Sequence, residues 1–548
     1  MVNLLRLSRW QWLSTSIALL LALPVLVIVA SLFMPASPTW DHLVETVLSE
    51  YISNSLILAT GVMVGTLLIG TSTAWLTTMC HFPGRKIFEW ALLLPLAMPA
   101  YIIAYTYTGI FDFAGPIQTT LREWTGWGYG DYWFPELRSI GGAITMLSLV
   151  LYPYVYLLAR AAFLEQSVTV LEVSRSLGDG PWRGFRRIAL PLARPAIIAG
   201  VSLVLMETLA DYGTVQYFGV STFTTGIFRT WFGLGDATSA SQLAALLLSF
   251  LFILLIVEKF SRRKARYHHT SASAYRPLSA YKLLGWKRWS AMLLCLIPLL
   301  LGFIVPATQL GYWALETWQE MVNEEFYRLV SNSLLLAATT ALLALIIALL
   351  LAYGLRIQRQ PLSTAAVRIA GLGYAIPGTV IAIGVIIPFA WLDNTLDGWM
   401  RSQFDISTGL ILSGTLVALI FGYLVRFLSV SLQTVESGLS KIRPNMDEAA
   451  RSLGANSRTI LFKIHLPMMR GTLLTALLLV FVDVMKELPA TLVLRPFNFN
   501  TLAVRAFELA SDERLADSST AALMIIAAGL IPVLLLSFSI THSRRQVN

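Results

Sequence analysis

The sequence predicts an all-α integral membrane protein with about twelve transmembrane helices, arranged as two parallel six-helix repeats. Of its 548 residues, 56% are hydrophobic and only 13% are charged, whereas soluble domains carry about 25% charged residues. Long apolar runs recur along the chain, and the second half repeats residues of the first. A soluble protein of this length would need far more polar surface to cover itself.

The apolar runs are long enough to cross a bilayer. A hydrocarbon core about 30 Å thick needs about 20 apolar residues per helix. The fifth and eleventh runs are the least apolar, because acidic residues fall inside them. The predicted spans are 12–34, 53–78, 88–109, 140–164, 196–217, 240–258, 290–312, 332–356, 367–391, 408–433, 472–495 and 519–541.

Basic residues orient these spans. Most of the 40 Lys and Arg residues fall in loops on one side, and the positive-inside rule places that side in the cytoplasm. Both termini are then cytoplasmic, in a multi-pass bacterial inner (plasma) membrane protein. A net charge of +9 spread over alternate loops indicates topology rather than nucleic-acid binding. The first run is longer than the apolar region of a secretory signal, which favours an uncleaved first helix.

The chain is an internal duplication. Asn54-Ser55 and Pro99 recur 278 residues later as Asn332-Ser333 and Pro377. Each half contributes an even number of spans, so both halves insert in the same orientation, related by a pseudo-two-fold axis along the membrane normal. Pairs that recur 276 residues apart include Glu172 and Glu448, Arg175 and Arg451, Gly178 and Gly454, Pro191 and Pro467, Asp211 and Glu487, Thr225 and Thr501, and Arg229 and Arg505.

The duplication divides the chain into five predicted parts. The two repeat cores are 50–258 and 328–541. Residues 1–49 hold the N-terminal cytoplasmic tip, the first transmembrane helix and an outer loop. Residues 259–327 hold a basic cytoplasmic linker, which can contact anionic membrane lipid, the seventh helix and an outer loop. Residues 542–548 form a cytoplasmic tail.

Both halves place a long polar segment between their fourth and fifth spans. In the second half, Met446, Ala449, Ala450 and Leu453 share one helical face. The glycine that follows, Gly454, can adopt the positive φ that closes a helix. Each segment is therefore predicted to be a short amphipathic helix, a glycine turn and a second helix that re-enters the membrane.

This spacing resembles the signature of ABC importer permeases: E-A-A, three residues, G, nine residues, I, one residue, L-P. The second copy matches at every position, whereas the first has Val173-Ser174 in place of the two alanines. The resemblance implies the type I ABC importer permease architecture, with a coupling helix that docks into a separate ATP-binding subunit. It assigns this coupling to Glu172, Arg175, Leu177, Gly178, Pro191, Glu448, Ala449, Ala450, Arg451, Leu453, Gly454 and Pro467.

The sequence contains no ATPase of its own. It has no G-x-x-x-x-G-K-[ST] loop to hold phosphates, and no catalytic motif or cluster with metal-ligand spacing. Cys80 and Cys295 are isolated from each other and give no disulfide framework. The chain is therefore expected to be a transport permease that binds no cofactor or metal, with ATP and Mg carried by two ATP-binding cassette subunits.

Ionisable residues inside spans are costly and usually functional. Two interpretations of the ionisable residues in spans five and eleven stay open: they line a polar translocation path, or they only hold helices together through an internal salt bridge of Lys486 with Asp483 or Glu487. Prolines after span eleven predict a broken helix that lines a cavity. The residues assigned to the path are Glu207, Asp211, Asp483, Lys486, Glu487 and Arg495.

Several stretches look like fused permeases of ferric-iron ABC importers: 210–215, 218–220, 222–231, 486–491, 495–498 and 501–505. The resemblance covers about residues 50 to 540. It implies that Fe(III) is delivered by a periplasmic or lipoprotein binding protein. Related permeases carry thiamine, polyamines or phosphonates, and these cargoes stay open. An ion-coupled secondary transporter with six plus six spans is the alternative from another class. A membrane enzyme is disfavoured because no catalytic constellation faces either side.

Overall fold

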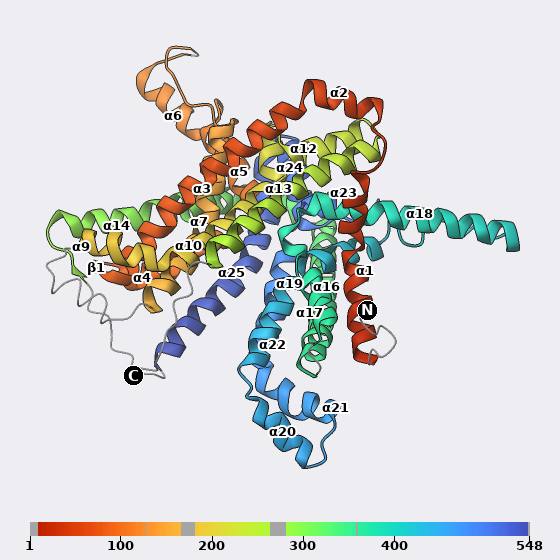
Figure 1. The fold of residues 1–548 in the computed structure, drawn as a ribbon. Helices are drawn as coiled ribbons and strands as arrows, with labels where there is room; N and C mark the ends of the chain where they lie inside the picture. The colour runs from red at the N-terminus through yellow and green to blue at the C-terminus, as the bar shows by residue number, and fades with distance from the viewer. Residues whose placement is uncertain (1–8, 129, 166–180, 264–280, 358–359, 546–548) are drawn as a thin grey trace. The chain divides into compact units, whose positions relative to one another are not determined.

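The structure is a computed structural model that describes residues 9–128, 130–165, 181–263, 281–357 and 360–545. It is nearly all helical and divides into two compact units. Unit 1 extends to Asp41 and includes Ile227–Leu246 and Asn323–Arg505; unit 2 comprises His42–Gly226, Leu247–Val322 and the chain from Ala506. Each unit thus joins the core of one sequence repeat to terminal helices of the other repeat (Figure 1).

The twelve-span prediction is confirmed. Within the described residues, eleven helices are long and apolar enough to cross a membrane, or up to twelve if one bent pair is a single span. The candidates are 12–31, 48–79, 140–164, 185–210, 237–260, 286–321, 324–357, 378–404, 416–440, 457–485 and 515–534, with the bent pair 85–97 and 100–125.

The core of unit 2 is a group of three helices that pack on one another, α3 (Leu48–Met79), α7 (Ile140–Glu165) and α10 (Leu190–Ala210). Small residues let α3 approach α7 closely. A Cβ atom at Gly70 would lie only 2.7 Å from Cβ of Val155. Such close backbone approach is a common way for apolar helices to associate within lipid.

Unit 1 has the corresponding group in the second repeat, α16 (Glu324–Ile357), α19 (Leu416–Ser440) and α22 (Leu466–Met485). Ala337, Ala341, Ala344 and Ala348 are fully buried along α16. They provide the small-residue face that glycines provide in α3. The same three-helix core is therefore built twice, as the sequence duplication predicts.

The third span of each half differs from its predicted course. Continuous helices over 88–109 and 367–391 are wrong, because the chain breaks immediately before Pro99 and Pro377. A residue before proline is forced out of the helical region, and both Met98 and Ile376 are extended. The broken elements are α4 (Arg85–Ala91), the 3₁₀ turn η2 (Leu94–Ala97) and α5 (Ala100–Phe111), and then α17 (Pro361–Ala370), η6 (Gly373–Ala375) and α18 (Gly378–Phe404).

The fifth span of each half also ends early. The break predicted in span eleven is present: α22 ends at Met485 and is followed by the short helix α23 (Pro489–Leu494). Span five breaks in the same way, because α10 ends at Ala210 and α11 (Gly213–Tyr217) follows. The runs 196–217 and 472–495 are thus each a long helix plus a short one.

The hydrogen bonds of two asparagines correct the predicted alignment of the two repeats after these breaks. The side-chain amide of Asn54 donates to the carbonyl of Ser221 over 2.9 Å. The amide of Asn332 donates to the carbonyl of Asn500 over 3.1 Å. The offset here is 279 residues, so Thr222 corresponds to Thr501. The pairs of Thr225 with Thr501 and Arg229 with Arg505 are wrong, because several threonines lie close together in the first half.

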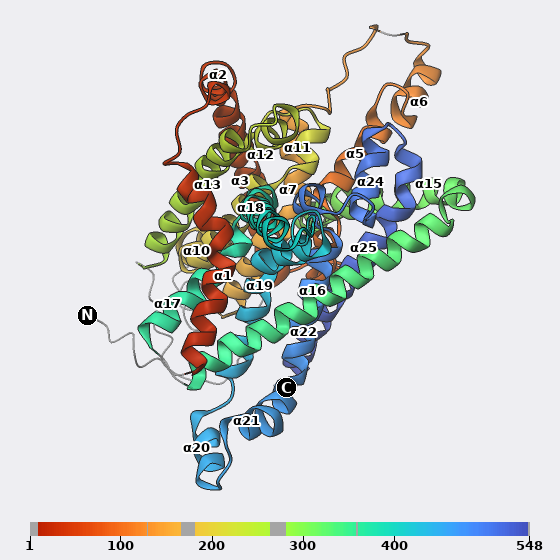
Figure 2. The same ribbon diagram turned by 90° about the vertical axis from the view of Figure 1, so that its right-hand side faces the viewer.

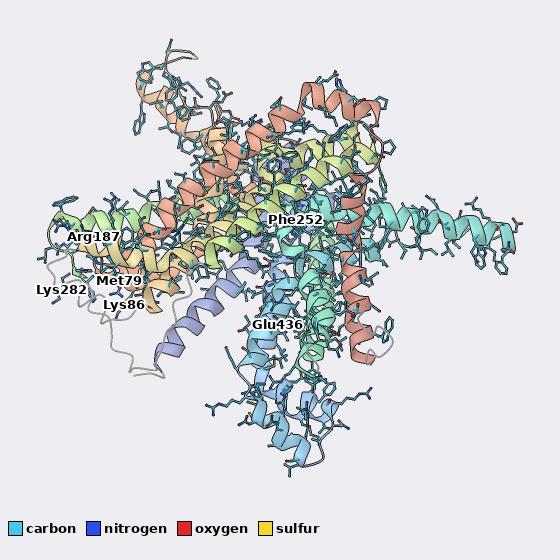
Figure 3. All side chains as sticks on the ribbon, viewed as in Figure 1. Met79, Lys86, Arg187, Phe252, Lys282 and Glu436 are labelled. Carbon is cyan, nitrogen blue, oxygen red and sulfur yellow. The ribbon has the colours of Figure 1, made fainter. Side chains whose placement is uncertain are left out.

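Basic side chains gather at one end of unit 2. Figure 3 shows Lys86, Arg187 and Lys282 at this end. Strand β1 (Cys80–His81), directly after α3, pairs in parallel with β2 (Tyr281–Lys282), which lies in the part 259–327 that the sequence assigns to the basic linker and the seventh helix. The other helices of unit 2 are α6 (Pro116–Thr125), α9 (Pro181–Gly184), η3 (Phe185–Ala189), α14 (Trp286–Leu299), η5 (Leu300–Ile304), α15 (Val305–Met321) and α25 (Leu515–Arg545).

The remaining elements complete unit 1 or cross the division between units. Unit 1 contains α1 (Arg9–Ser31), η4 (Arg229–Gly233), α20 (Pro444–Ser452), α21 (Ser457–Ile460) and the π-helical turn η7 (Leu461–His465). Its first helix, α1, packs on α17 and α18. The division falls within α2 (Pro38–Thr46), α12 (Phe223–Phe228), α13 (Ala237–Arg263) and α24 (Leu502–Ser511).

Candidate functional site

The polar segment of the second repeat folds as the sequence predicts. Helix α20 carries the E-A-A residues, and Gly454 ends the turn with a φ of +84°. Pro467 lies in the first turn of α22, as Pro191 does in α10. The matching residues of the first repeat, Glu172, Arg175, Leu177 and Gly178, lie outside the described residues.

The apolar residues of α20 divide between two directions. Ala450 is buried against unit 1, whereas Met446, Ala449 and Leu453 are exposed. Leu453 is 87% exposed. Glu448 and Arg451 are also exposed. We name the exposed residues Met446, Ala449 and Leu453 the apolar ridge.

A charged cluster that the sequence reasoning missed fixes this helix to unit 1. Asp447 is buried, and its Oδ2 lies 2.8 Å from Nε of Arg356 at the end of α16. Nε2 of the fully buried His465 lies 2.8 Å from Oδ1 of the same carboxylate. Burial raises the pKa of Asp447, but the hydrogen bonds from Arg356 and His465 outweigh burial and leave this pKa below its ordinary value. The carboxylate is therefore ionised at neutral pH.

Arg356 also binds the chain that leads into α20. Its guanidinium donates to the carbonyls of Leu439 and Ile442, the latter over 3.0 Å. One turn earlier on α16, the hydroxyl of Tyr353 donates to the carbonyl of Ser457 over 2.6 Å. The end of α16 therefore holds the segment on both sides of α20. We name Arg356, Asp447 and His465 the anchor cluster.

The first repeat has a different chemistry at these positions. Thr78, Leu171 and Ala189 occupy the places of Arg356, Asp447 and His465. Trp75, which replaces Tyr353, packs on Phe185 with ring centroids 4.9 Å apart. At these positions the second repeat thus has an ionic cluster, whereas the described part of the first repeat has an aromatic contact between Trp75 and Phe185. This difference could have been noticed from the sequence by comparing the aligned repeats.

Glu487 forms a buried ion pair with a residue that was not among the predicted site residues. Its Oε2 lies 3.6 Å from Nε of Arg426 on α19, and both side chains are less than a tenth exposed. Its Oε1 accepts a hydrogen bond from the backbone of Ala490 over 3.1 Å. Glu487 therefore also caps α23 after the break in the span.

A glycine makes room for this pair. A Cβ atom at Gly378 would lie 2.5 Å from Oε1 of Glu487 and 2.6 Å from Nη1 of Arg426. In the first repeat, alanine (Ala100) follows the equivalent proline and Val150 replaces the arginine. The glycine and the arginine thus occur together in one repeat and are both absent from the other.

We expect Gly378→Ala to destabilise the protein by about 1–3 kcal/mol, because the added methyl must displace a buried charged pair. Unfolding of the purified protein in mixed detergent micelles measures this change. Gly398→Ala is the matched control on the same helix, since a Cβ there meets nothing within 4 Å. Equal stability of the two variants would contradict the close packing of Gly378 against Glu487 and Arg426.

In the first repeat, Asp211 caps the short helix after the break. It accepts hydrogen bonds from the Thr214 hydroxyl over 2.9 Å and from the Val215 backbone over 3.1 Å. Thr224 donates to the backbone carbonyl of Asp211 over 2.6 Å. Asp211 and Glu487 therefore have the same local role: each satisfies backbone groups freed where its span breaks.

The other predicted path residues lie near these breaks. Lys486 and Asp483 form an ion pair of 2.9 Å one turn apart, as the structural interpretation expects. Glu207 is half-buried on α10, and Arg495 is half-buried directly after α23. Among the described residues, no group of three or more His, Cys, Asp or Glu side chains could hold a metal ion.

Comparison with known proteins identifies the family. Residues 66–267 and 344–548 each match the model of the binding-protein-dependent transport system inner membrane component. The chain is 28% identical over 492 residues to the Fe(3+)-transport system permease protein FbpB 2 of Haemophilus influenzae, covering 89% of this chain and 90% of that protein. It is 24% identical over 467 residues to the ferric transport system permease protein FbpB of Actinobacillus pleuropneumoniae, covering 80% and 64%.

A shorter relative matches a single half. The molybdenum transport system permease protein ModB of Escherichia coli is 26% identical over 203 residues, which cover 36% of this chain and 86% of that protein. One repeat of this chain therefore corresponds to nearly a whole permease in that system. With two matched regions that cover most of its length, the chain belongs to the binding-protein-dependent transport system inner membrane components and is a non-catalytic, duplicated permease of an ABC importer.

Proposed function

We propose that this permease forms the membrane path for Fe(III) delivered by an extracytoplasmic binding protein, and that two ATP-binding cassette subunits carrying ATP and Mg drive it. The observation that supports the coupling most directly is the apolar ridge on α20. Met446, Ala449 and Leu453 are exposed on a helix that the anchor cluster fixes to α16. An exposed ridge on a fixed helix suits docking into a partner's groove.

The orientation follows from charge. The basic ends of the spans, including the end of α16 and the segment around α20, would lie in the cytoplasm, where the ATPase subunits are. The carboxylates at the broken spans would then lie at membrane depth. Two relatives named for ferric transport, matched over 89% and 80% of this chain, support iron as the cargo, and hard oxygen ligands suit Fe(III).

Uptake into proteoliposomes tests the cargo. The permease is reconstituted with its ATPase subunits and offered Fe(III) on its binding protein, or thiamine, a polyamine or a phosphonate, with and without ATP. We expect uptake of iron that requires ATP. ATP-dependent uptake of another cargo would discard iron but keep the ABC mechanism, whereas uptake driven by a proton gradient alone would overturn the coupling to ATP.

The variant Leu453→Asp tests the ridge. Because Leu453 is exposed, the charge should leave the fold of the permease intact and disrupt docking. We expect at least a tenfold loss of ATP-driven uptake and weaker co-purification of the ATPase subunits. Ser452→Asp is the matched control, an exposed neighbour outside the ridge. Equal uptake by Leu453→Asp and the wild type would exclude the ridge from docking.

A further inference from the structure

The distal half of α18 leaves the packed core of unit 1. Its buried residues end at Asp393, although the helix continues to Phe404. At 27 residues it is about 40 Å long. In both views α18 lies across the direction of α1, and Figure 1 shows its distal end projecting from the helices around it (Figures 1 and 2). Both α1 and α18 are long and apolar enough to span the membrane, but they cross one another, so they do not both run along the membrane normal. Because the distal half of α18 leaves the packed core, we take α1 as the span, which places α18 closer to the membrane plane.

Exposed apolar side chains follow one stripe of this projecting helix. Leu392, Leu396 and Trp399 are spaced four and three residues apart, and all three are exposed. Asn394 and Arg401 lie on the opposite face. The return loop extends the apolar surface with exposed Ile406, Leu410 and Ile411. We name residues 391–412 the outer hairpin.

Two carboxylates satisfy the backbone of the return loop without solvent. Asp393 accepts hydrogen bonds from the backbone of Ile411, Leu412 and Ser413 over 2.7–3.2 Å. Asp397 accepts from the backbone of Thr408 over 2.7 Å and of Gly409 over 3.2 Å. Irregular backbone tolerates a water-poor environment only when its N–H groups are bonded in this way.

We propose that the outer hairpin lies in the headgroup region of the bilayer leaflet opposite α20, with its apolar stripe toward the acyl chains. The hairpin returns to α19 at the end of that helix away from α20. It also continues directly from the part of α18 that is buried in unit 1. Amphipathic helices with Trp and Leu on one face and polar groups on the other bind such interfaces.

Site-specific labelling tests the placement. The full transporter, with Cys80→Ala and Cys295→Ala, carries a single cysteine at Leu396 or, as matched control, at Asn394, and each is labelled with an environment-sensitive fluorophore. In phosphatidylcholine–phosphatidylglycerol vesicles, we expect blue-shifted emission at Leu396. We also expect lipids spin-labelled at the headgroup to quench the Leu396 label several-fold more than lipids labelled deep in the acyl chain, with a water-exposed signal at Asn394.

Three outcomes overturn the proposal. Equal water exposure at both positions would place the hairpin in solvent. Strongest quenching by the deep spin label would make the distal half of α18 transmembrane. Protection of Leu396 only after the binding protein is added would assign the surface to that protein. Leu392→Cys provides a second position on the stripe should Leu396→Cys fold poorly. This measurement reports where the outer hairpin lies relative to the bilayer, and its result does not depend on which cargo the permease carries.

Discussion

Replacing Glu487 with alanine is expected to lower the free energy of unfolding by about 3–5 kcal/mol, because it leaves the buried guanidinium of Arg426 without its carboxylate. It also removes the hydrogen bond to the backbone of Ala490 at the start of α23. Unfolding of the purified permease by a denaturing detergent in mixed micelles measures the loss. Glu448→Ala, which removes an exposed carboxylate from α20, should change stability by less than about 0.5 kcal/mol.

The double variant separates the two interpretations of these charges. Arg426→Val with Glu487→Leu removes both charges and places at position 426 the residue type that the first repeat has at Val150. Replacing a buried ion pair by apolar residues often restores stability. If the pair is only structural, the double variant should be stable and should transport normally. A stable double variant that transports poorly would place Glu487 in the translocation path. A double variant less stable than Glu487→Ala would contradict the ion pair itself.

Much of this fold could be predicted from hydrophobicity and duplication. The spans are long apolar runs whose limits depend on local composition, so their number and approximate position follow from the sequence. The breaks at Pro99 and Pro377 were less predictable: a run such as 88–109 is apolar on both sides of its break, and hydropathy does not detect a change of direction. Hydropathy also does not predict that each unit contains terminal helices of the other repeat, because this depends on which apolar faces pack together in the folded chain.

The site was predictable to a different degree in each part. The motif spacing identified α20 and the turn at Gly454 because both are local features of the chain. The partners of Asp447 and Glu487 come from helices about 91 and 61 residues away in sequence, and only the fold reveals such pairs. Residue identity pairs Thr225 with Thr501, whereas the hydrogen bonds of Asn54 and Asn332 pair Thr222 with Thr501.

Removing the charge of Asp447 is expected to uncouple transport from ATP hydrolysis. In Asp447→Asn, Arg356 and His465 lose the carboxylate that joins α20 to α16. Hydrogen bonds to charged groups contribute about 1.5–3 kcal/mol. The equilibrium that keeps α20 attached to α16 should therefore weaken by about tenfold to a hundredfold. We expect ATP-driven uptake of the cargo to fall at least tenfold, while the ATPase subunits still bind and hydrolyse ATP. Uptake and phosphate release are measured on the same proteoliposomes, and the ratio of uptake to phosphate released should fall.

The ratio is informative because a general loss of folding would lower both activities together. Arg356→Lys keeps the positive charge, but its single nitrogen has three donors and cannot reproduce the four hydrogen bonds that the guanidinium makes to Asp447, Leu439 and Ile442. Uptake per ATP should therefore fall in this variant too. Arg443→Gln, an exposed change at the start of the same helix, should keep the wild-type ratio. Since the first repeat lacks this cluster, Thr78→Ala should also leave the ratio unchanged. A normal ratio in Asp447→Asn would show that contacts with the ATPase subunit alone orient α20, and that the anchor cluster only stabilises the permease.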